Sequence, residues 1–571
     1  MTNMIEKAKA LGLYPERAIP NSRQLEWYSR ELSAFVHFGM STFYDREWGD
    51  GTESPALFNP TELDCRQWIR VLKDAGFKIA ILTAKHHDGF CLWQTKTTEH
   101  SIKNSPYKNG KGDIVREFTD ACRELGMKAG IYLSPWDRNN ATWGSDAYND
   151  LYAEQLTELM SNYGDIYECW WDGAGSENAV YDWERWAGIV RTLQPNAVIF
   201  GGEPSLVDVR WVGNEKGIAG DPCWSTVNRS SLEKEITAEL NSGDPDGELF
   251  IPAEADVSIR PGWFYHEDQD HEVRSPHNLV NLWFNSTGRN CGLLLNLPPD
   301  RRGLLHENDI AAIKGFKDIL TRNFESDLAK AAKVSATSER SSLCPASAVL
   351  DGDPQSFYSP EDTDTCPELV FDFENKVSFN CAVFSEVIEL GQKIRGFELS
   401  AMVDGERKLL AKGESVGNKY AARFEAVSTD RVFLKITASV SAPLLRSFGL
   451  YAVEEKKKAE NGVGFVGRDL AKSSSTVIEK NTESGELFIQ LGGIRRFNLL
   501  KLIGEGIESF EVYIFNGSSF EYFGEGKGAS PESIFDFGKT VDWSYRLKIK
   551  ISFATGASVN NITPKLYCAE E

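Results

Sequence analysis

Several carboxylates and histidines in this sequence come directly after short apolar runs. Asp172 follows an aromatic-rich run and precedes a glycine, and Glu215 closes a later apolar run. His37 and the adjacent pair His86-His87 follow two earlier runs. Two carboxylates can cleave a glycosidic bond, one as nucleophile and one as general acid and base, whereas histidines with carboxylates can bind a metal ion. Taken alone, Asp172 can also cap a turn, a common place for aspartate.

Short apolar runs alternate with amphipathic segments from residue 33 to residue 324. The runs predict strands at 33–40, 78–90, 128–137, 165–172, 196–202, 208–215, 249–259 and 291–298, and the amphipathic segments predict helices at 66–77, 113–127, 149–163, 182–193, 278–285 and 306–324. This alternation is typical of an α/β fold of the (β/α)8-type, a TIM barrel. The connection between the fifth and sixth strands is too short for a helix, so we expect a somewhat irregular barrel. An open doubly wound sheet is the alternative, and the lack of a glycine-rich phosphate loop after the first strand disfavours it.

The chain after residue 325 has a different pattern. Short alternating apolar runs separated by turn residues predict two β-sandwich domains there, with examples at 368–373, 382–387, 432–436, 487–491 and 511–515. We therefore predict a barrel domain at 1–325, a first sandwich at 335–455 and a second at 460–571, with the three lysines 456–458 at the seam.

Composition limits the partners of the protein. The net charge of −22 disfavours nucleic acid and anionic membranes, and no segment approaches the about 18 uninterrupted apolar residues of a membrane span. The 15 tryptophans and 18 tyrosines favour a neutral sugar, because aromatic faces stack on sugar rings. The ten cysteines are scattered without a CxxC pair, which predicts reduced thiols. Residues 1–17 carry charges throughout, which together with the reduced thiols predicts a cytoplasmic protein unless a leader has been removed. The sequence gives no indication of the oligomeric state.

In a parallel barrel the carboxyl ends of all strands meet on one face. The residues that this face would collect are His37, His86, His87, Trp136, Asp172, Glu215, Glu254 and Asp256, followed in the chain by Arg260 and Trp263. Adjacent residues of a strand point to opposite sides, so His86 and His87 are not expected to share a metal ion. We therefore favour a sugar pocket over a metal site and expect no metal and no cofactor.

A set of short segments in the barrel region matches a known family. The segments are Trp27-Tyr28, FVHFGMSTF (35–43), REWGDG (46–51), LTAKHHDGFCLW (82–93), GIYLSPWDRN (130–139), WWDGAG (170–175), WVGNEKG (211–217), SIRPGWFY (258–265) and NLPPDRRG (296–303). They cover the whole barrel in order. By these segments the chain resembles glycoside hydrolase family 29, the retaining α-L-fucosidases.

The resemblance implies a two-step mechanism at the barrel mouth. Asp172 would be the nucleophile and Glu215 the general acid and base, with about 5–5.5 Å between their carboxyl groups. Glu254 on the seventh strand and Glu203 at the end of the fifth compete for the second role. The positions that match residues around the fucose are His37, Glu47, Trp48, His86, His87, Tyr132 and Trp170, and further substrate-binding candidates are Trp136, Arg260 and Trp263.

The context of Glu215, WVGNE (211–215), resembles the subgroup that cleaves α-1,3 and α-1,4 linkages. The expected function is therefore release of fucose from Lewis-type or related fucosylated glycans. One alternative is a broad fucosidase that also acts on α-1,2 and α-1,6 links and on aryl fucosides, and another is a non-catalytic glycan-binding barrel. The segments 347–354, 369–380, 385–401 and 447–454 resemble a galactose-binding-like, discoidin-type module, which would either support the barrel or bind sugar.

Overall fold

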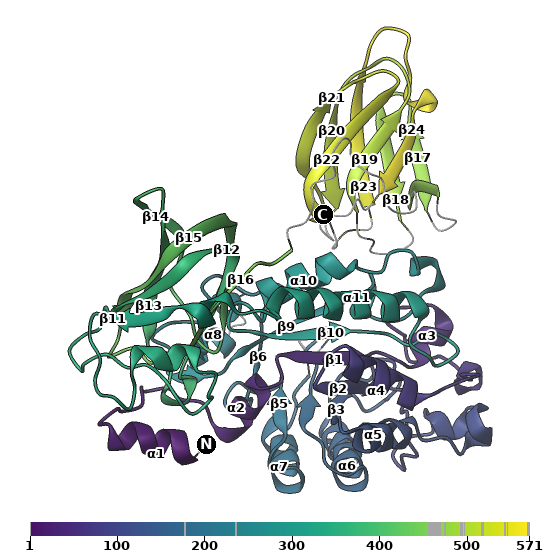
Figure 1. Ribbon diagram of the computed structural model, residues 1–571. Coiled ribbons are helices and arrows are strands. Elements are labelled where there is room, and N and C mark those ends of the chain that lie inside the picture. The colour runs from purple at the N-terminus through teal and green to yellow at the C-terminus, as the bar shows by residue number, and fades with distance from the viewer. Residues whose placement is uncertain are drawn as a thin grey trace. The chain divides into compact units, whose positions relative to one another are not determined.

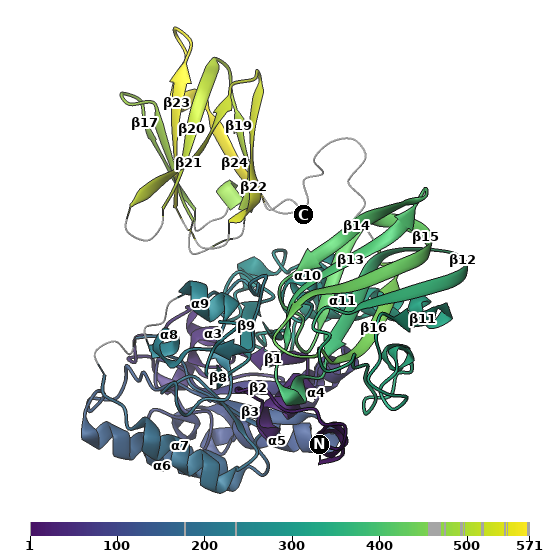
Figure 2. The ribbon, with the colours of Figure 1, turned by 90° about the vertical axis from the view of Figure 1, so that its left-hand side faces the viewer.

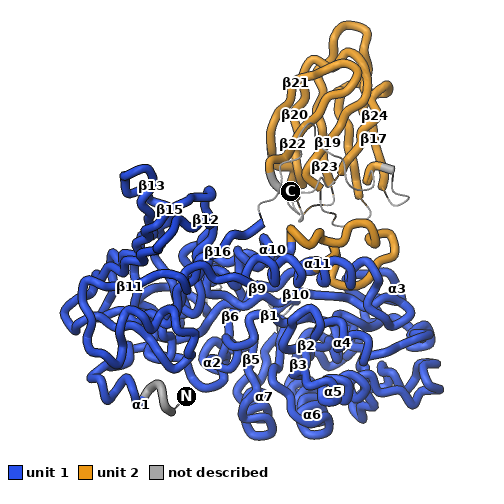
Figure 3. The backbone as a smooth tube through the Cα atoms, in the orientation of Figure 1, with its two compact units in different colours: residues 1–258, 279–455 blue, residues 259–278, 456–571 orange. Residues whose placement is uncertain are grey.

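The computed structural model describes residues 2–175, 179–233, 237–454, 470–472, 476–491, 495, 497–515, 519–541, 544 and 546–567. The chain divides into two compact units, residues 1–258 with 279–455 and residues 259–278 with 456–571 (Figure 3). Within the described residues, no helix combines the length and the apolar character needed to cross a membrane. The nine cysteines that lie in these ranges are free thiols.

The first unit contains a nearly closed barrel of eight parallel strands (Figures 1 and 2). Their order around the barrel is β5 (Val198–Phe200), β4 (Glu168–Trp170), β3 (Lys128–Leu133), β2 (Ile79–Lys85), β1 (Leu32–Val36), β10 (Gly292–Asn296), β9 (Ala253–Ser258) and β6 (Arg210–Trp211). A parallel bridge between Phe200 and Val209 links the two ends of this sheet. The barrel predicted from the sequence is confirmed, and its irregular part lies between the fifth and sixth strands as expected.

Six longer helices follow the barrel strands at or near the predicted positions. They are α4 (Cys65–Asp74), α5 (Ile114–Leu125), α6 (Asp146–Asn162), α7 (Trp183–Leu193), α10 (Pro276–Asn285) and α11 (Glu307–Phe324). Figure 1 shows α4, α5, α6 and α7 on the outside of the strands. The smaller elements are α1 (Thr2–Ala10), α2 (Ser22–Tyr28), α3 (Met40–Tyr44), α8 (Arg229–Glu233), α9 (Thr237–Ser242) and the paired strands β7 (Thr226–Val227) and β8 (Leu249–Phe250).

Burial and capping explain why these elements form. β1 and β2 are buried at every residue, so their sequences are mostly apolar and do not alternate between apolar and polar residues. Asp64, Asp113 and Asp182 cap α4, α5 and α7 by accepting a hydrogen bond from a backbone N–H of the first turn. The observed strands are shorter than predicted, and burial does not mark their ends: residues 86–93 remain buried although they lie beyond β2.

The first unit also contains an antiparallel sheet that follows the barrel. It has the order β11 (Lys333–Ala336), β12 (Glu368–Glu386), β15 (Tyr420–Ser439), β13 (Ile394–Val403) and β14 (Glu406–Gly413), and β16 (Leu445–Tyr451) pairs with β12. Its alternating side chains form an apolar core in which the rings of Phe371 and Phe448 stack with centroids 4.2 Å apart.

The second unit contains two antiparallel sheets that share one apolar core. One sheet has the order β17 (Val477–Asn481), β18 (Glu486–Gln490), β23 (Arg546–Phe553), β20 (Ile507–Phe515) and β21 (Phe520–Lys527), and the other has β22 (Glu532–Val541), β19 (Phe497–Ile503) and β24 (Thr563–Tyr567). This is the β-sandwich architecture expected near the C-terminus. The lysines 456–458, which the sequence predicts to mark the seam between the two sandwiches, lie outside the described residues.

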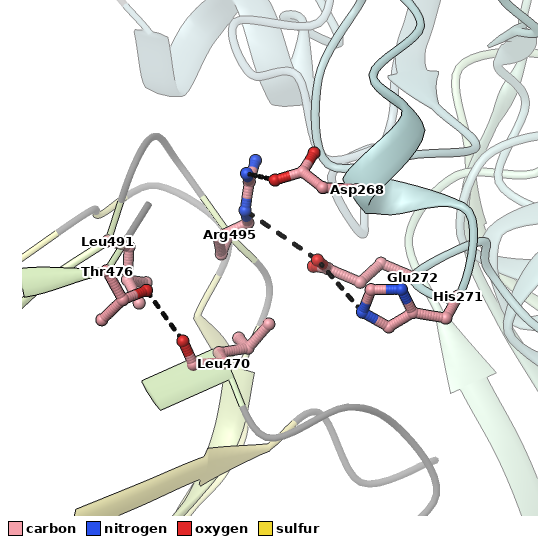
Figure 4. A pocket seen from close by; sticks show the side chains of 7 residues that line it. All are labelled: Asp268, His271, Glu272, Leu470, Thr476, Leu491 and Arg495. Carbon is pink, nitrogen blue, oxygen red and sulfur yellow. Dashed lines mark hydrogen bonds and ion pairs between the residues drawn. The ribbon is translucent and has the colours of Figure 1, made fainter. Parts of the chain in front are cut away.

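Loop 259–278, which follows β9, belongs to the second unit and contacts its β-domain around a small pocket (Figure 4). The side chain of Arg495 is 11% exposed. It donates a hydrogen bond to Asp268 at 2.5 Å and lies 3.9 Å from a carboxylate oxygen of Glu272. The residues that line the pocket are Asp268, His271, Glu272, Leu470, Thr476, Leu491 and Arg495.

Candidate active site

Asp172 lies just beyond the end of β4, at the carboxyl-end mouth of the barrel. The backbone N–H of Trp171 still donates to the carbonyl of Phe200 in β5, so the chain leaves the sheet at Asp172 itself. The Tyr132 hydroxyl donates to Oδ2 of Asp172 at 2.9 Å, and the Ala174 N–H donates to Oδ1 at 2.9 Å. The side chain is 27% exposed. Both oxygens are therefore oriented by a donor while the carboxylate stays accessible.

His87 faces this carboxylate with its Nε2 atom. Nε2 lies 3.7 Å from Oδ2 of Asp172, and Nδ1 lies 2.8 Å from the Ser134 hydroxyl. That hydroxyl donates to the carbonyl of Trp136 at 2.7 Å, so it accepts the proton of Nδ1. Burial lowers the pKa of His87 to about 4. The ring is thus neutral at pH 7, with Nε2 as its acceptor nitrogen.

His37 is held in the same tautomer by a different partner. Its Nδ1 lies 2.8 Å from Oδ1 of Asn296, whose amide nitrogen donates to the Ser258 hydroxyl at 3.0 Å. The amide oxygen therefore accepts a hydrogen bond from Nδ1, which leaves Nε2 as the acceptor nitrogen of the ring. Burial lowers the pKa of His37 to about 3, so this histidine is also neutral.

The arrangement of His86 and His87 corrects one expectation. We predicted that these adjacent side chains point to opposite sides, but their ring centroids lie 4.0 Å apart. The reason is that both residues lie in the turn beyond Lys85, where β2 ends, so the alternation of a strand does not apply. The His86 ring lies nearly parallel to the Tyr132 ring at 5.7 Å and edge-on to His37 at 5.8 Å. His37, His86, His87 and Tyr132 form one cluster.

Two tryptophans extend this cluster toward solvent. Trp48 is 53% exposed, and its ring lies 5.6 Å from both His87 and Trp136. The Trp136 ring lies 5.0 Å from His87. Gly175 has a φ of 71°, and a Cβ there would lie 2.3 Å from the Trp136 ring, so the loop after Asp172 packs closely on this tryptophan. Glu47, next to Trp48 in the chain, is half-buried.

Glu254 lies deeper in the barrel, between two indoles. Trp170 donates to its Oε1 and Trp27 to its Oε2, each from Nε1 at 3.2 Å. Trp170 in turn stacks on Phe200 with centroids 4.1 Å apart. Glu254 is 1% exposed, and burial raises its pKa to about 7. This glutamate is therefore part of the packed interior, and Trp170 contributes to its enclosure.

Glu215 lies in the exposed loop that follows β6. Both ends of the loop are hydrogen-bonded to β9. The backbone N–H of Val212 donates to the carbonyl of Glu254 at 3.0 Å, and that of Gly217 donates to the carbonyl of Asp256 at 3.1 Å. The Glu215 side chain itself is exposed to solvent. Glu203, the third acidic candidate, is half-buried and accepts a hydrogen bond from the Ser205 hydroxyl at 3.3 Å.

Asp256 is a site residue that our sequence analysis did not assign a role. It is 4% exposed, and its Oδ1 accepts a hydrogen bond from Nε1 of Trp211 at 2.8 Å. Burial, the charge of Glu215 and that of Asp172 all raise the pKa of Asp256 well above its usual value. Asp172 and Glu215 therefore both lie within electrostatic reach of one buried carboxyl. The sequence signal that could have identified Asp256 is its position two residues after Glu254, because this spacing places both side chains on the inner face of β9.

Arg260 and Trp263 lie on loop 259–278 in the second unit. Arg260 donates to Asp270 at 2.9 Å and lies 4.8 Å from the centroid of the Tyr265 ring. The Tyr265 hydroxyl donates to the other oxygen of Asp270 at 3.2 Å. Trp263 is half-buried. These contacts order the loop internally.

Taken together, the described side chains suit a ligand rich in hydroxyl groups. His37 and His87 supply acceptor nitrogens, Asp172 supplies an accessible carboxylate, and aromatic rings form the surrounding wall. In the ranges that the structure covers, no group of three His, Cys, Asp or Glu side chains has the arrangement of a metal site.

Comparison with known proteins adds a family to this geometry. A family model described as Alpha-L-fucosidase matches residues 12–325. The chain is 40% identical over 449 residues to Alpha-L-fucosidase 1 of Arabidopsis thaliana, covering 76% of this chain and 88% of that protein. A glycoside hydrolase 29 family member from an unknown rumen bacterium is similar with 31% identity and a TM-score of 0.73, over 97% of this chain and 100% of that one. A Ruminococcus gnavus GH29 fucosidase in complex with fucose is similar with 29% identity and a TM-score of 0.72, over 77% and 96% of the two chains.

Proposed function

The chain belongs to the alpha-L-fucosidase family of glycoside hydrolases, and we propose that it is a retaining, exo-acting enzyme specific for α-1,3- and α-1,4-linked fucose. Its substrates would be Lewis-type or similar branched glycans. The observation that carries the mechanism is the geometry at Asp172, where two donors fix both oxygens of a carboxylate that remains 27% exposed.

In the proposed first step, a carboxylate oxygen of Asp172 attacks the anomeric carbon of fucose. The bond from this carbon to the glycosidic oxygen breaks, and Glu215 gives its proton to that oxygen. The product is a covalent fucosyl-enzyme ester and a free leaving alcohol. In the second step Glu215 takes a proton from water, the resulting oxygen attacks the anomeric carbon, and Asp172 is released. Exposure supports Glu215 over Glu254, because the acid must reach the leaving oxygen and then water.

The neutral histidines have a defined part in this proposal. His37 and His87 each present an acceptor nitrogen, so they would receive hydrogen bonds from hydroxyl groups of the fucose. His86, Tyr132, Trp48 and Trp136 would enclose the sugar, with the Tyr132 hydroxyl also holding Asp172 in place. The similarity to the Ruminococcus gnavus fucosidase, which was solved with fucose, supports this choice of sugar.

The nucleophile is tested with Asp172→Asn, which keeps the shape of the side chain and removes its charge. We expect kcat on an aryl fucoside to fall about a thousandfold or more, as is usual when a nucleophile is removed. The matched control is Asp150→Asn, at an exposed aspartate on α6, which should keep wild-type activity. Activity close to wild type in Asp172→Asn would show that another group attacks the sugar.

The acid and base is tested by comparing Glu215→Ala with Glu254→Ala in the presence of azide. Azide can replace the water and form a fucosyl azide when the general base is missing. Rescue of Glu215→Ala alone is the expected result, and rescue of Glu254→Ala alone would reverse the assignment. NMR of the first sugar released should show the α-anomer, because a double displacement retains configuration.

The linkage preference rests on the sequence context of Glu215. We expect a Lewis trisaccharide to be cleaved with a higher kcat/KM than α-1,2- or α-1,6-linked fucosides. Equal rates on all of these substrates, and on an aryl fucoside, would instead support the broad-specificity alternative.

A further inference from the structure

Trp211 is an exposed tryptophan whose orientation is fixed. Its indole N–H donates to the buried carboxyl of Asp256 at 2.8 Å, yet the residue remains 38% exposed. A tryptophan usually packs its rings in a core and uses its N–H at the polar edge. Here the polar edge is buried against Asp256, while part of the indole faces solvent.

The strand geometry places this indole at the barrel mouth. Trp211 is the last residue of β6 and lies opposite Glu254 in β9. The preceding residue, Arg210, points away from the interior, because its guanidinium donates to the backbone carbonyls of Trp224, Leu240 and Ile251. Neighbouring side chains of a strand point to opposite sides, so Trp211 points inward. Its N–H reaches Asp256, which lies further toward the carboxyl end of β9 than Glu254.

The same short segment carries the proposed general acid. Glu215 follows Trp211 in the loop that Val212 and Gly217 fasten to β9. Ile218, just after this loop, is 39% exposed. Two exposed apolar side chains therefore flank one exposed carboxyl group at the mouth of the barrel.

We propose that Trp211 is the stacking platform for the sugar ring that carries the fucose, on the leaving-group side of the site. This rests on the proposed role of Glu215. A general acid contacts the glycosidic oxygen, so the ring beyond that oxygen lies next to the acid and away from the nucleophile. A pyranose presents a face of C–H groups that packs on a flat indole. Trp211 would therefore bind the pyranoside to which fucose is linked.

In this proposal Asp256 is a positioning residue for the indole of Trp211. It acts on the leaving sugar through Trp211, because its carboxyl group holds the indole N–H and thereby sets the angle of the ring. A side chain that keeps an acceptor oxygen at this point should keep the platform, and an apolar one should release it.

The test compares two substrates whose leaving groups differ in size. A Lewis trisaccharide leaves a disaccharide, which would reach Trp211, whereas α-L-fucosyl fluoride leaves a fluoride ion, which has no ring and needs no proton from an acid. For Trp211→Ala we expect kcat/KM on the trisaccharide to fall about tenfold or more, chiefly through KM, as is usual when an aromatic contact that binding buries is removed. Hydrolysis of the fluoride should change less than twofold. Trp211→Phe, which keeps a flat ring, should recover part of the loss.

The control is Tyr522→Ala, which removes a tyrosine that is 56% exposed on β21 and should leave both substrates unaffected. An equal loss on both substrates for Trp211→Ala would overturn the proposal and indicate a general structural role. An unchanged kcat/KM on both substrates would also overturn the proposal. The exposed surface of Trp211 would then be assigned to a protein or glycan partner that takes no part in the reaction.

The role of Asp256 is read from the ratio of the two kcat/KM values together with KM on the trisaccharide, because the ratio alone also responds to Glu215, whose proton the fluoride does not need. Asp256→Asn should keep the wild-type ratio, because the amide oxygen can still accept the indole N–H. Asp256→Leu should lower the ratio as Trp211→Ala does. If wild-type protein cleaved neither substrate, the proposed catalytic function would fail. The platform would then be tested separately, by titrating the trisaccharide into wild-type protein and Trp211→Ala, where equal affinity would overturn it.

Discussion

Glu254→Gln tests the assignment of the interior carboxyl most directly. Burial raises the pKa of Glu254 to about 7, so between pH 4.5 and 7 the folded protein holds a proton here that the unfolded chain has released. A carboxyl whose pKa is raised in the folded state has its smallest effect on the free energy of unfolding at low pH. It destabilises the fold increasingly as the pH rises toward 7. Glutamine does not titrate, so the substitution removes this destabilisation.

The size of the effect follows from the two pKa values. An ordinary glutamate pKa near 4.5 and a folded value of about 7 give a loss of roughly 1 kcal/mol at pH 5 and roughly 3 kcal/mol at pH 8. Glu254→Gln should therefore gain about 2 kcal/mol of stability relative to wild type between these two pH values. The amide cannot accept from both indoles, which costs about 1–3 kcal/mol, but this cost is the same at both pH values and cancels in the difference.

The measurement is the melting temperature of wild type and Glu254→Gln at pH 5 and pH 8. For a folded unit of this size, the difference between variant and wild type should become more positive by about 2 °C at pH 8. Glu154→Gln, at an exposed glutamate of α6, is the matched control and should show no such trend. The same Glu254→Gln protein should hydrolyse fucosyl fluoride and an aryl fucoside within tenfold of wild type. A difference that stays constant with pH would refute the buried, raised-pKa state of Glu254.

Two further predictions concern groups that position others. Ser134→Ala removes the hydroxyl that fixes the tautomer of His87. We expect kcat/KM on an aryl fucoside to fall about five- to thirtyfold, which corresponds to the loss of one good hydrogen bond. An unchanged kcat/KM would contradict the assigned tautomer. Arg495→Ala removes the cation that faces Asp268 and Glu272, so loop 259–278 should be cut faster in limited proteolysis. If the cleavage rate there matches wild type, these ion pairs do not hold the loop.

The barrel was predictable because its strands are buried on both faces. Such strands are mostly apolar runs, and β1, β2 and β10 were recognised by that signal. The ends of the strands were not predictable, since residues beyond a strand can be equally buried. This is why the inward direction of both His86 and His87 was missed: the period of two applies within β2 and ends with it.

The depth of each carboxyl was a second property that the sequence alone could not supply. Glu254 and Asp256 share the inner face of β9, and their spacing says nothing of how far each lies from the mouth. The structure separates them by their partners, because Glu254 accepts hydrogen bonds from Trp27 and Trp170 while Asp256 accepts one from Trp211. Those three indoles are distant in the chain, and the pairing depends on the register of neighbouring strands.

The solvent exposure of each carboxyl group indicates which chemical role it can have. Glu254 is 1% exposed and Asp256 4% exposed, whereas the Asp172 side chain is 27% exposed and Glu215 lies in an exposed loop. A general acid must reach the leaving oxygen and then a water molecule, which favours Glu215 over either group on β9. A buried carboxyl near two others is better suited to hold a neighbour in place, as Asp256 holds Trp211. The division between reacting and supporting carboxyls in our proposals therefore follows from how far each strand carries its acid toward the barrel mouth.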